Sequence, residues 1–215
     1  MFPLCYRPLE NGVSKYFIKY RFVATSFIST VAETFPEVQH VCLQRDFYKN
    51  VLSMERAFSG LLMEKIFQLF LHYRLWWLTD YVLICERIPA LEAPAAEHLG
   101  VTNFETYAFI LAAVAKMIQD FKNEDSPVGF RLSLDYEDLL ENPEATIRRL
   151  FKVCGYDGMA DPRQALETLE QDSQAGTTIA KPIVARKRIR LPSKETIKRV
   201  DTFLEAYGLP KLKIG

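Results

Sequence analysis

Arg45 and Ser53 are the first residues whose type and spacing suggest a binding site. Arg45 follows the run 38–44, whose apolar centre at 41–43 is typical of a buried strand. In open parallel sheets, ligands bind at the carboxyl ends of strands, against the first turns of the following helices. A guanidinium there can bind a phosphate, and a hydroxyl from the helix can add a second contact. The alternative is an arginine paired with Asp46 or Glu55 and a serine packed against its own helix.

Two further sets of basic residues could contact an anion. Lys19 and Arg21 alternate with Ile18 and Tyr20 in the run 15–22, so both share one face of a predicted strand. That face of the strand lines either a ligand-binding cleft or the solvent-exposed surface. A second basic run lies in a loop near the carboxyl end, and such a run is most often a solvated surface: Arg186, Lys187, Arg188 and Arg190.

The composition predicts one globular domain over residues 1–215. Hydrophobic residues make up 49% of the chain and charged residues 25%, and 215 residues can bury a substantial core. Lys plus Arg equals Asp plus Glu, at 27 each, so the charge balance does not indicate a nucleic-acid partner. The four cysteines lie far apart without a CxxC pair, so we expect no metal site.

Neither a signal peptide nor a membrane span is expected. The start "MFPLCYRPLENG" carries prolines and an acidic residue where a signal peptide needs an apolar core. The most apolar long stretch, 60–84, is interrupted by four charged residues: Glu64, Lys65, Arg74 and Asp80. We therefore expect a cytoplasmic protein, with the Golgi as an alternative if an anchor lies upstream.

Hydrophobic periodicity predicts strands alternating with helices. The runs 15–22 and 38–44 have the aromatic and β-branched content of strands, and helical spacing follows each of them. Residues 47–70 are predicted as one helical run, and the middle of the chain, 60–120, as helical apart from a loop indicated by Pro89, Pro94 and Gly100. Strand, helix, strand, helix indicates βαβ units. The predicted fold class is therefore α/β, with a parallel sheet flanked by helices.

The second half of the chain continues this pattern. The run 129–139 alternates like a strand and ends in acidic residues. A helix is predicted over 142–155, with Pro143 in its first turn and Gly155 as its stop. A polar loop and a capped final helix are predicted over 171–212.

Three segments together resemble the sulfotransferases that use 3′-phosphoadenosine-5′-phosphosulfate (PAPS) as sulfuryl donor. They are "FPEVQHVCLQRDFYKNVLS" (35–53), "LDYEDLLENPEATIRRLFKVCGYD" (134–157) and "IKYR" (18–21). The resemblance is best over residues 15–157. It implies the P-loop NTPase-like fold of that family. By the resemblance, the first two segments both contribute residues to the donor site.

On the donor side, the resemblance implies a role for each candidate residue. Arg45 and Ser53 match the family's ligands of the donor 3′-phosphate. Tyr136 matches a residue near the adenine. The late basic loop, with Arg186 and Lys187, matches a loop that the family uses against the same phosphate.

On the acceptor side, the chain departs from the family. The segment "IKYR" matches the strand at the acceptor site, so Lys19 and Arg21 are candidates to contact the sulfuryl group or an acidic acceptor. Cytosolic members carry a histidine base where this chain has Arg21. An arginine stays protonated at neutral pH and cannot serve as that base. The catalytic base is therefore unknown.

The loop that holds the 5′ end of the donor is a second departure. Members begin with a Pro-Lys-Ser-Gly-Thr-Thr type of loop, but nothing before residue 15 supplies it, and G-x-x-x-x-G-K-[ST] does not occur. "SQAGTT" (173–178) resembles the loop in letters only, and Phe47 stands where the family commonly has proline. We therefore expect a sheet incomplete at its amino-terminal side, with an unpaired edge that favours self-association.

The resemblance implies transfer of a sulfuryl group from PAPS to a hydroxyl or amine of a small-molecule or carbohydrate acceptor, without a metal. The main alternative is a catalytically silent nucleotide- or partner-binding module on the same fold. A P-loop phosphotransferase ranks third, because it would need the Walker loop that this chain does not contain.

Overall fold

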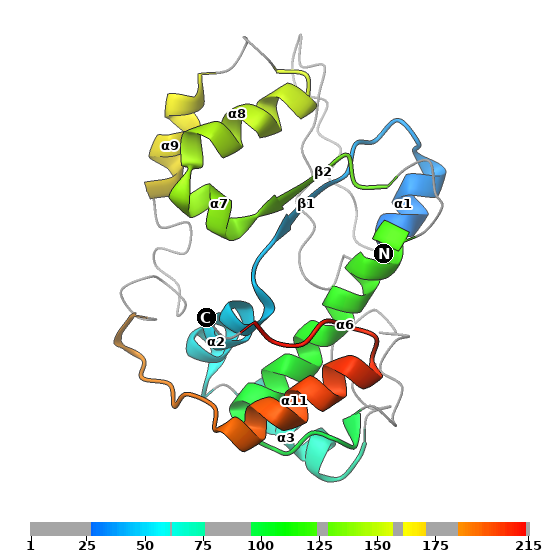
Figure 1. Ribbon diagram of the computed structural model, residues 1–215, viewed down its shortest axis with the longest axis vertical. Helices are drawn as coiled ribbons and strands as arrows, with labels where there is room; N and C mark the ends of the chain where they lie inside the picture. Colours follow the sequence, from blue (N-terminus) through cyan, green and yellow to red (C-terminus); the bar gives the residue numbers. More distant parts are fainter. Residues whose placement is uncertain are drawn as a thin grey trace.

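The protein is mixed α/β and mostly helical, with a small parallel sheet of two strands (Figure 1). This confirms the α/β class predicted from periodicity. The computed structural model describes residues 27–60, 62–75, 96–123, 129–156, 161–170 and 185–213. The strand predicted at 15–22 and the first part of the predicted loop, 171–184, lie outside these residues.

The sheet pairs β1 (Val41–Gln44) with β2 (Leu132–Asp135) in parallel. The register places Gln44 opposite Asp135, so both strands end at the same level. β1 is shorter than the predicted strand 38–44. The parallel pairing expected from alternating strands and helices is confirmed for these two strands.

Two helices, rather than one, follow β1. α2 (Phe47–Phe58) is capped by Asp46, and α3 (Leu62–His72) begins after a turn at Gly60. Gly60 has φ +84°, the left-handed conformation that glycine adopts readily and that ends a helix. The prediction of one helical run over 47–70 is therefore wrong, because the glycine breaks the periodic pattern in its middle.

α6 (Asn103–Asn123) is a long helix that runs from the lower helices toward α1 (Ile28–Thr34) in Figure 1. Its start is a capping box. The Thr102 hydroxyl accepts a hydrogen bond from Glu105 N at 3.3 Å, and the Glu105 carboxylate accepts one from Thr102 N at 3.1 Å. The helical prediction for the middle of the chain holds for α3 and α6.

β2 gives way to a helix at Tyr136, which begins α7 (Tyr136–Glu141). The prediction of a strand over 129–139 is wrong in this second half. The reason is local, because Glu137 and Asp138 place negative charge in the first turn, where the helix dipole favours it. Tyr136 therefore stands at a strand-to-helix junction, as Arg45 does.

α8 (Pro143–Val153) and α9 (Pro162–Glu170) follow, and the two helices lie together with α7 at one end of the molecule (Figure 1). Pro143 at the first helical position and Gly155 with φ +71° just past the end confirm the predicted limits of α8. α9 falls in a polar stretch where no helix was predicted.

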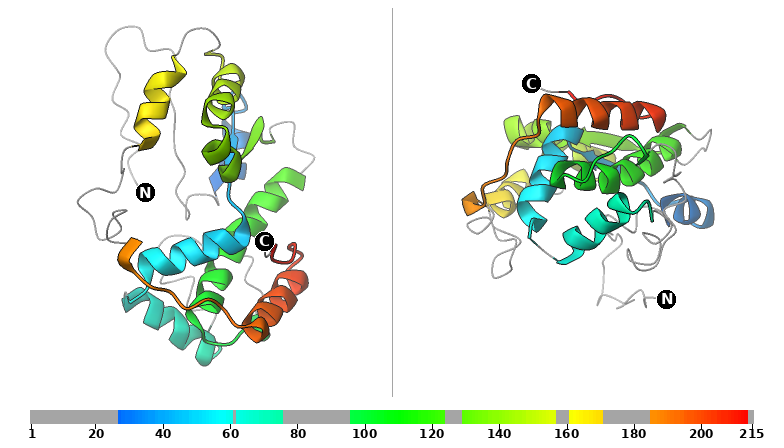
Figure 2. Two further views of the ribbon diagram at one scale, coloured as in Figure 1. Left: turned by 60° about the vertical axis from the view of Figure 1, so that its left-hand side comes forward. Right: turned by 90° about the horizontal axis from the view of Figure 1, so that it is seen from below.

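α11 (Lys194–Ala206) is the last helix and is capped by Ser193, whose side chain accepts a hydrogen bond from Thr196 N at 3.1 Å. This confirms the predicted capped helix. Figure 2 shows α6 between α11 and α3. The main core forms around α6, and its buried members include Val51, Leu71, Phe104, Ala108, Phe109, Val200, Phe203 and Leu204.

Candidate functional site

The carboxyl ends of β1 and β2 bring Arg45 and Tyr136 together. Because Gln44 pairs with Asp135, the next residue of each strand leaves the sheet at the same level. The Arg45 Cζ atom lies 5.0 Å from the centroid of the Tyr136 ring, which is a cation–π contact. Two residues that the sequence assigned to one site from separate motifs thus lie side by side.

Polar contacts from Glu137 join the two strand ends further. Its carboxylate accepts a hydrogen bond from Asp46 N at 3.4 Å and lies 3.6 Å from Lys49 Nζ. The Asp46 carboxylate accepts a hydrogen bond from Lys49 N at 3.0 Å and so caps α2. We call the five residues Arg45, Asp46, Lys49, Tyr136 and Glu137 the strand-end corner. Its two cations and two carboxylates give it no formal net charge.

The strand-end corner can bind an anion through Arg45 without losing its internal contacts. A guanidinium stacks on a ring through its flat face, and its N–H donors point outward in the plane. Arg45 is exposed and Tyr136 half-buried, so those donors are open to solvent. Lys49 could add a second positive charge, in competition with Glu137.

Ser53 lies on the same face of α2 as Lys49, one turn further from the strand-end corner. It is half-buried. Ser53 is six positions beyond Phe47, a rise of roughly 9 Å along the helix axis. A ligand that contacts both Arg45 and Ser53 would therefore lie along the first two turns of α2.

Lys187 lies at the opposite end of α2. Its Nζ donates a hydrogen bond to the Ala57 carbonyl at 2.9 Å, where helix carbonyls lack partners and a positive charge is favoured. Ala57 is ten positions beyond Phe47, a rise of roughly 15 Å along the helix axis. Arg186 is exposed beside it. The structure therefore does not bring Arg186 and Lys187 to the strand-end corner.

Lys19 and Arg21 lie outside the described residues. Their assignment to the acceptor side stays a prediction.

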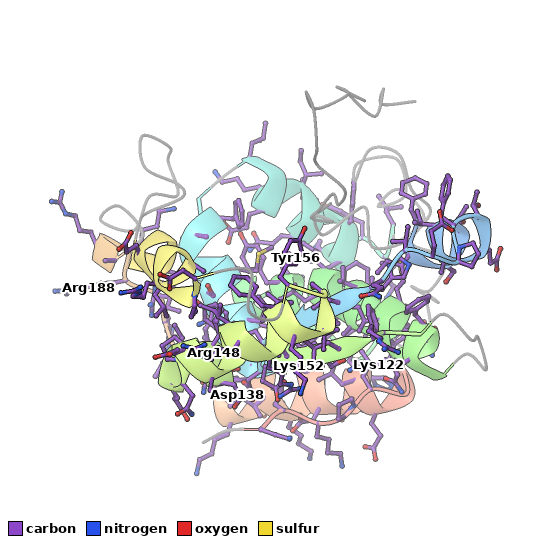
Figure 3. All side chains as sticks on the ribbon, turned by 90° about the horizontal axis from the view of Figure 1, so that it is seen from above. Lys122, Asp138, Arg148, Lys152, Tyr156 and Arg188 are labelled. Atoms are coloured by element: carbon purple, nitrogen blue, oxygen red, sulfur yellow. The ribbon has the colours of Figure 1, made fainter. Side chains whose placement is uncertain are left out.

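Other basic side chains sit on separate helices. Figure 3 shows Arg148 and Lys152 on α8 and Lys122 near the end of α6. Arg148 is engaged by Glu144, whose Oε1 lies 2.7 Å from its Nη2. The strand-end corner is distinguished from them by the two strand ends that position it.

Lys49 and Glu137 are the members of the strand-end corner that the sequence did not single out. Lys49 stands four residues before Ser53, which puts it on the same helix face, and Glu137 directly follows Tyr136. With the strand register known, both would have been found, because carboxyl ends of paired parallel strands meet at one edge of the sheet.

Comparison with protein-family models, with curated proteins and with solved structures found no match. In the part of the chain that the structure describes, no helix is long and apolar enough to cross a membrane. Among the same residues, no group of three or more His, Cys, Asp or Glu side chains is suited to hold a metal ion. The strand-end corner and the sequence motifs are therefore the observations that bear on function.

Proposed function

We propose that this protein is a sulfotransferase-like domain whose strand-end corner binds the 3′-phosphate of an adenosine 3′,5′-bisphosphate nucleotide. The observation that carries the proposal is the meeting of Arg45 and Tyr136 at the ends of two parallel strands. The two residues come from motifs far apart in the sequence. Parallel α/β sheets bind their ligands at this edge.

The chemistry of the strand-end corner supports a phosphate ligand. Arg45 offers a planar fork of donors that fits phosphate geometry, and its contact with Tyr136 restricts the motion of the side chain before binding. Charged hydrogen bonds of this kind contribute ~1.5–3 kcal/mol each. Ser53 would add a neutral hydrogen bond one turn beyond Lys49.

The activity we propose is transfer of a sulfuryl group from PAPS to a hydroxyl or amine of a small-molecule or carbohydrate acceptor. The acceptor oxygen or nitrogen forms a bond to sulfur while the bond from sulfur to the phosphate oxygen breaks, and the acceptor proton leaves to a base. Positioning and charge neutralisation supply the catalysis, as in phosphoryl transfer. Lys19 or Arg21 would contact the transferring group, with Arg21 as a cation and not as the base.

A catalytically silent nucleotide-binding module is the second candidate. The observation in its favour is that the chain contains no Lys-Ser-Gly-Thr type of loop for the 5′ side of the donor. Assays of PAPS with phenols, alcohols, amines and sugars separate the two. Turnover supports the transferase, and bisphosphate binding without turnover supports the silent module.

Arg45→Ala tests the proposed phosphate contact. We expect it to weaken binding of adenosine 3′,5′-bisphosphate by ~1.5–3 kcal/mol, because a charged hydrogen bond is lost, and to weaken adenosine 5′-monophosphate much less. Isothermal titration calorimetry measures both. Arg163→Ala is the matched control, since Arg163 is exposed on α9 and pairs with Asp161 at 2.8 Å. Equal losses for the two nucleotides in Arg45→Ala would contradict the assignment.

A further inference from the structure

Three buried acidic groups from three helices lie inside the molecule. Glu55 of α2, Glu64 of α3 and Tyr107 of α6 are 5%, 6% and 4% exposed. Within the described residues, Glu55 Oε2, Glu64 Oε1 and Tyr107 Oη have no hydrogen-bond partner. Buried polar atoms are nearly always paired, so three orphaned oxygens require an explanation. We call these three side chains the acidic cluster.

The acidic cluster lies where three helices pack together, because α2 and α3 both contact α6 and the Gly60 amide between α2 and α3 bonds Glu64. Burial raises the pKa of Glu55 to about 7, and the charge of Glu64 contributes to the rise. Burial also raises the pKa of Tyr107, and the charges of Glu64 and Glu55 raise it further. The Tyr107 phenol therefore stays protonated, and burial opposes ionisation of Glu55.

In the part of the chain that the structure describes, the two carboxylates have no cationic partner. The other oxygen of Glu64 accepts a hydrogen bond from Gly60 N, which is a neutral donor. No ion pair joins Glu55 or Glu64 to a basic side chain in that part of the chain. A single proton on Glu55 would leave one buried negative charge, whereas a divalent cation would balance both carboxylates.

We propose that Glu55, Glu64 and Tyr107 form a binding site for a hard divalent cation between α2, α3 and α6. Carboxylate oxygens are the type of ligand that Mg²⁺, Mn²⁺ and Ca²⁺ prefer, and the neutral Tyr107 hydroxyl would add a weaker oxygen contact, directly or through a bound water. Two carboxylates are a common protein contribution to a Mg²⁺-type site, with water completing the shell. The sequence did not indicate this site, because its ligands come from three separate helices.

The turn between α2 and α3 faces solvent beside the acidic cluster. Gly60 is exposed, and the space around its Cα is open. Its amide hydrogen bond to Glu64 links this solvent-facing turn directly to the acidic cluster.

The proposed cation site is independent of the strand-end corner. On α2, Glu55 shares the inner face with buried Val51, while Lys49 and Ser53 share another face. The proposal therefore does not rest on sulfuryl transfer or on nucleotide binding.

The test is a titration of the full chain with Mn²⁺. Calorimetry and electron paramagnetic resonance measure the binding. We expect one saturable site with a Kd below about 1 mM at pH 7.5. Binding should weaken roughly tenfold for each pH unit below 7, because a proton must leave Glu55. Glu55→Gln and Glu64→Gln should each weaken binding at least about tenfold. Glu205→Gln is the control, since Glu205 is exposed on α11.

A second readout uses Tb³⁺, whose luminescence is excited by a nearby tyrosine. Tyr107→Phe should abolish most of the sensitised emission, even though the chain keeps nine other tyrosines of its ten. This variant also serves if a Gln variant fails to fold, which far-ultraviolet circular dichroism would reveal.

Three results would overturn the proposal. One is the lack of saturable Mn²⁺ binding to the wild-type chain. Another is equal Mn²⁺ affinity in the wild type and in folded Glu55→Gln or Tyr107→Phe. The third is an infrared carboxylic-acid band that Glu55→Gln removes and that Mn²⁺ does not change, since the acidic cluster would then be neutralised by protons alone.

Discussion

Glu105 shows how a single buried charge can organise the fold. Its side chain is 0% exposed, and its carboxylate accepts hydrogen bonds from Gly100 N at 2.8 Å, Thr102 Oγ1 at 2.6 Å and Arg199 Nε at 2.7 Å. Burial by itself would raise the pKa of Glu105, but the bonds to Arg199, Thr102 and Gly100 outweigh it and hold the pKa below its usual value. This carboxylate therefore ties the start of α6 to α11.

We expect Glu105→Gln to lower the free energy of unfolding by ~2–4 kcal/mol, because it leaves Arg199 without its charged partner and turns an amide group toward backbone donors. Urea unfolding at pH 7 measures the loss. Glu144→Gln is the matched control, since Glu144 is 58% exposed in its pair with Arg148, and such pairs contribute ~0–1 kcal/mol. Similar losses in both variants would contradict the role of Glu105.

The Glu105 carboxylate also determines how the stability of the fold changes at acidic pH. Because the pKa of Glu105 is lowered in the folded state, its contribution to stability is present above its ordinary pKa and is lost as pH falls through the folded value. Glu105→Gln should remove this acid-side loss.

At the scale of elements, the turn between α2 and α3 depends on one backbone conformation. Gly60 has φ +84°, and a Cβ added there would meet nothing within 4 Å. Gly129 has the same open surroundings without the positive φ. The two glycines therefore differ in backbone strain and not in space.

We expect Gly60→Ala to destabilise the protein by ~1–2 kcal/mol, the cost of a left-handed conformation for a residue with a Cβ. Gly129→Ala should leave stability unchanged or raise it slightly, because it restricts the unfolded chain. Thermal or urea unfolding of the two variants in parallel measures the difference. Equal stabilities would mean that the turn relaxes at no cost.

The burial of Glu55 on the inner face of α2 predicts a second pH effect, opposite in sign to that of Glu105. Glu55 titrates near its ordinary pKa of 4.5 when unfolded and at about 7 when folded. As pH rises from 4.5 to 7, the unfolded chain loses a proton that the folded chain keeps, so stability falls. Across this pH range, the free energy of unfolding falls by about 3 kcal/mol in total.

Urea unfolding from pH 4.5 to 8, with a chelator present to remove metal ions, measures this decline. Glu55→Gln should flatten it, because glutamine does not titrate. Glu144→Gln should leave the slope of the wild type. An identical slope in wild type and Glu55→Gln would show that folding does not raise the pKa of Glu55.

At the scale of the whole molecule, α2 links the strand-end corner, the buried Glu55 and the contact with Lys187. Its first turn carries the strand-end corner, its inner face carries Glu55, and its last turn accepts the hydrogen bond from Lys187. β1, which leads into α2, exposes Leu43 by 53%. Exposed apolar strand residues favour association, and the predicted self-association stays a prediction.

The sequence predicted the parts of this arrangement that depend on local pattern. Parallel pairing followed from alternating strands and helices, and the limits of α8 and α11 followed from Pro143, Gly155 and Ser193. Features set by contacts distant in the sequence were missed. Neither the link from Glu137 to Asp46 nor the contact of Lys187 with α2 has a sequence signal, because each depends on how the strands and loops pack in three dimensions.

The most direct test of the central claim compares two nucleotides that differ only in the position of one phosphate. Adenosine 3′,5′-bisphosphate and adenosine 2′,5′-bisphosphate carry the same charge, so any difference in calorimetric affinity reports geometry and not net charge. The strand-end corner predicts that the 3′ isomer binds about tenfold tighter or more, a difference of ~1.4 kcal/mol, and that Arg45→Ala removes this preference. Equal affinity for the two isomers, or binding of neither, would contradict the account.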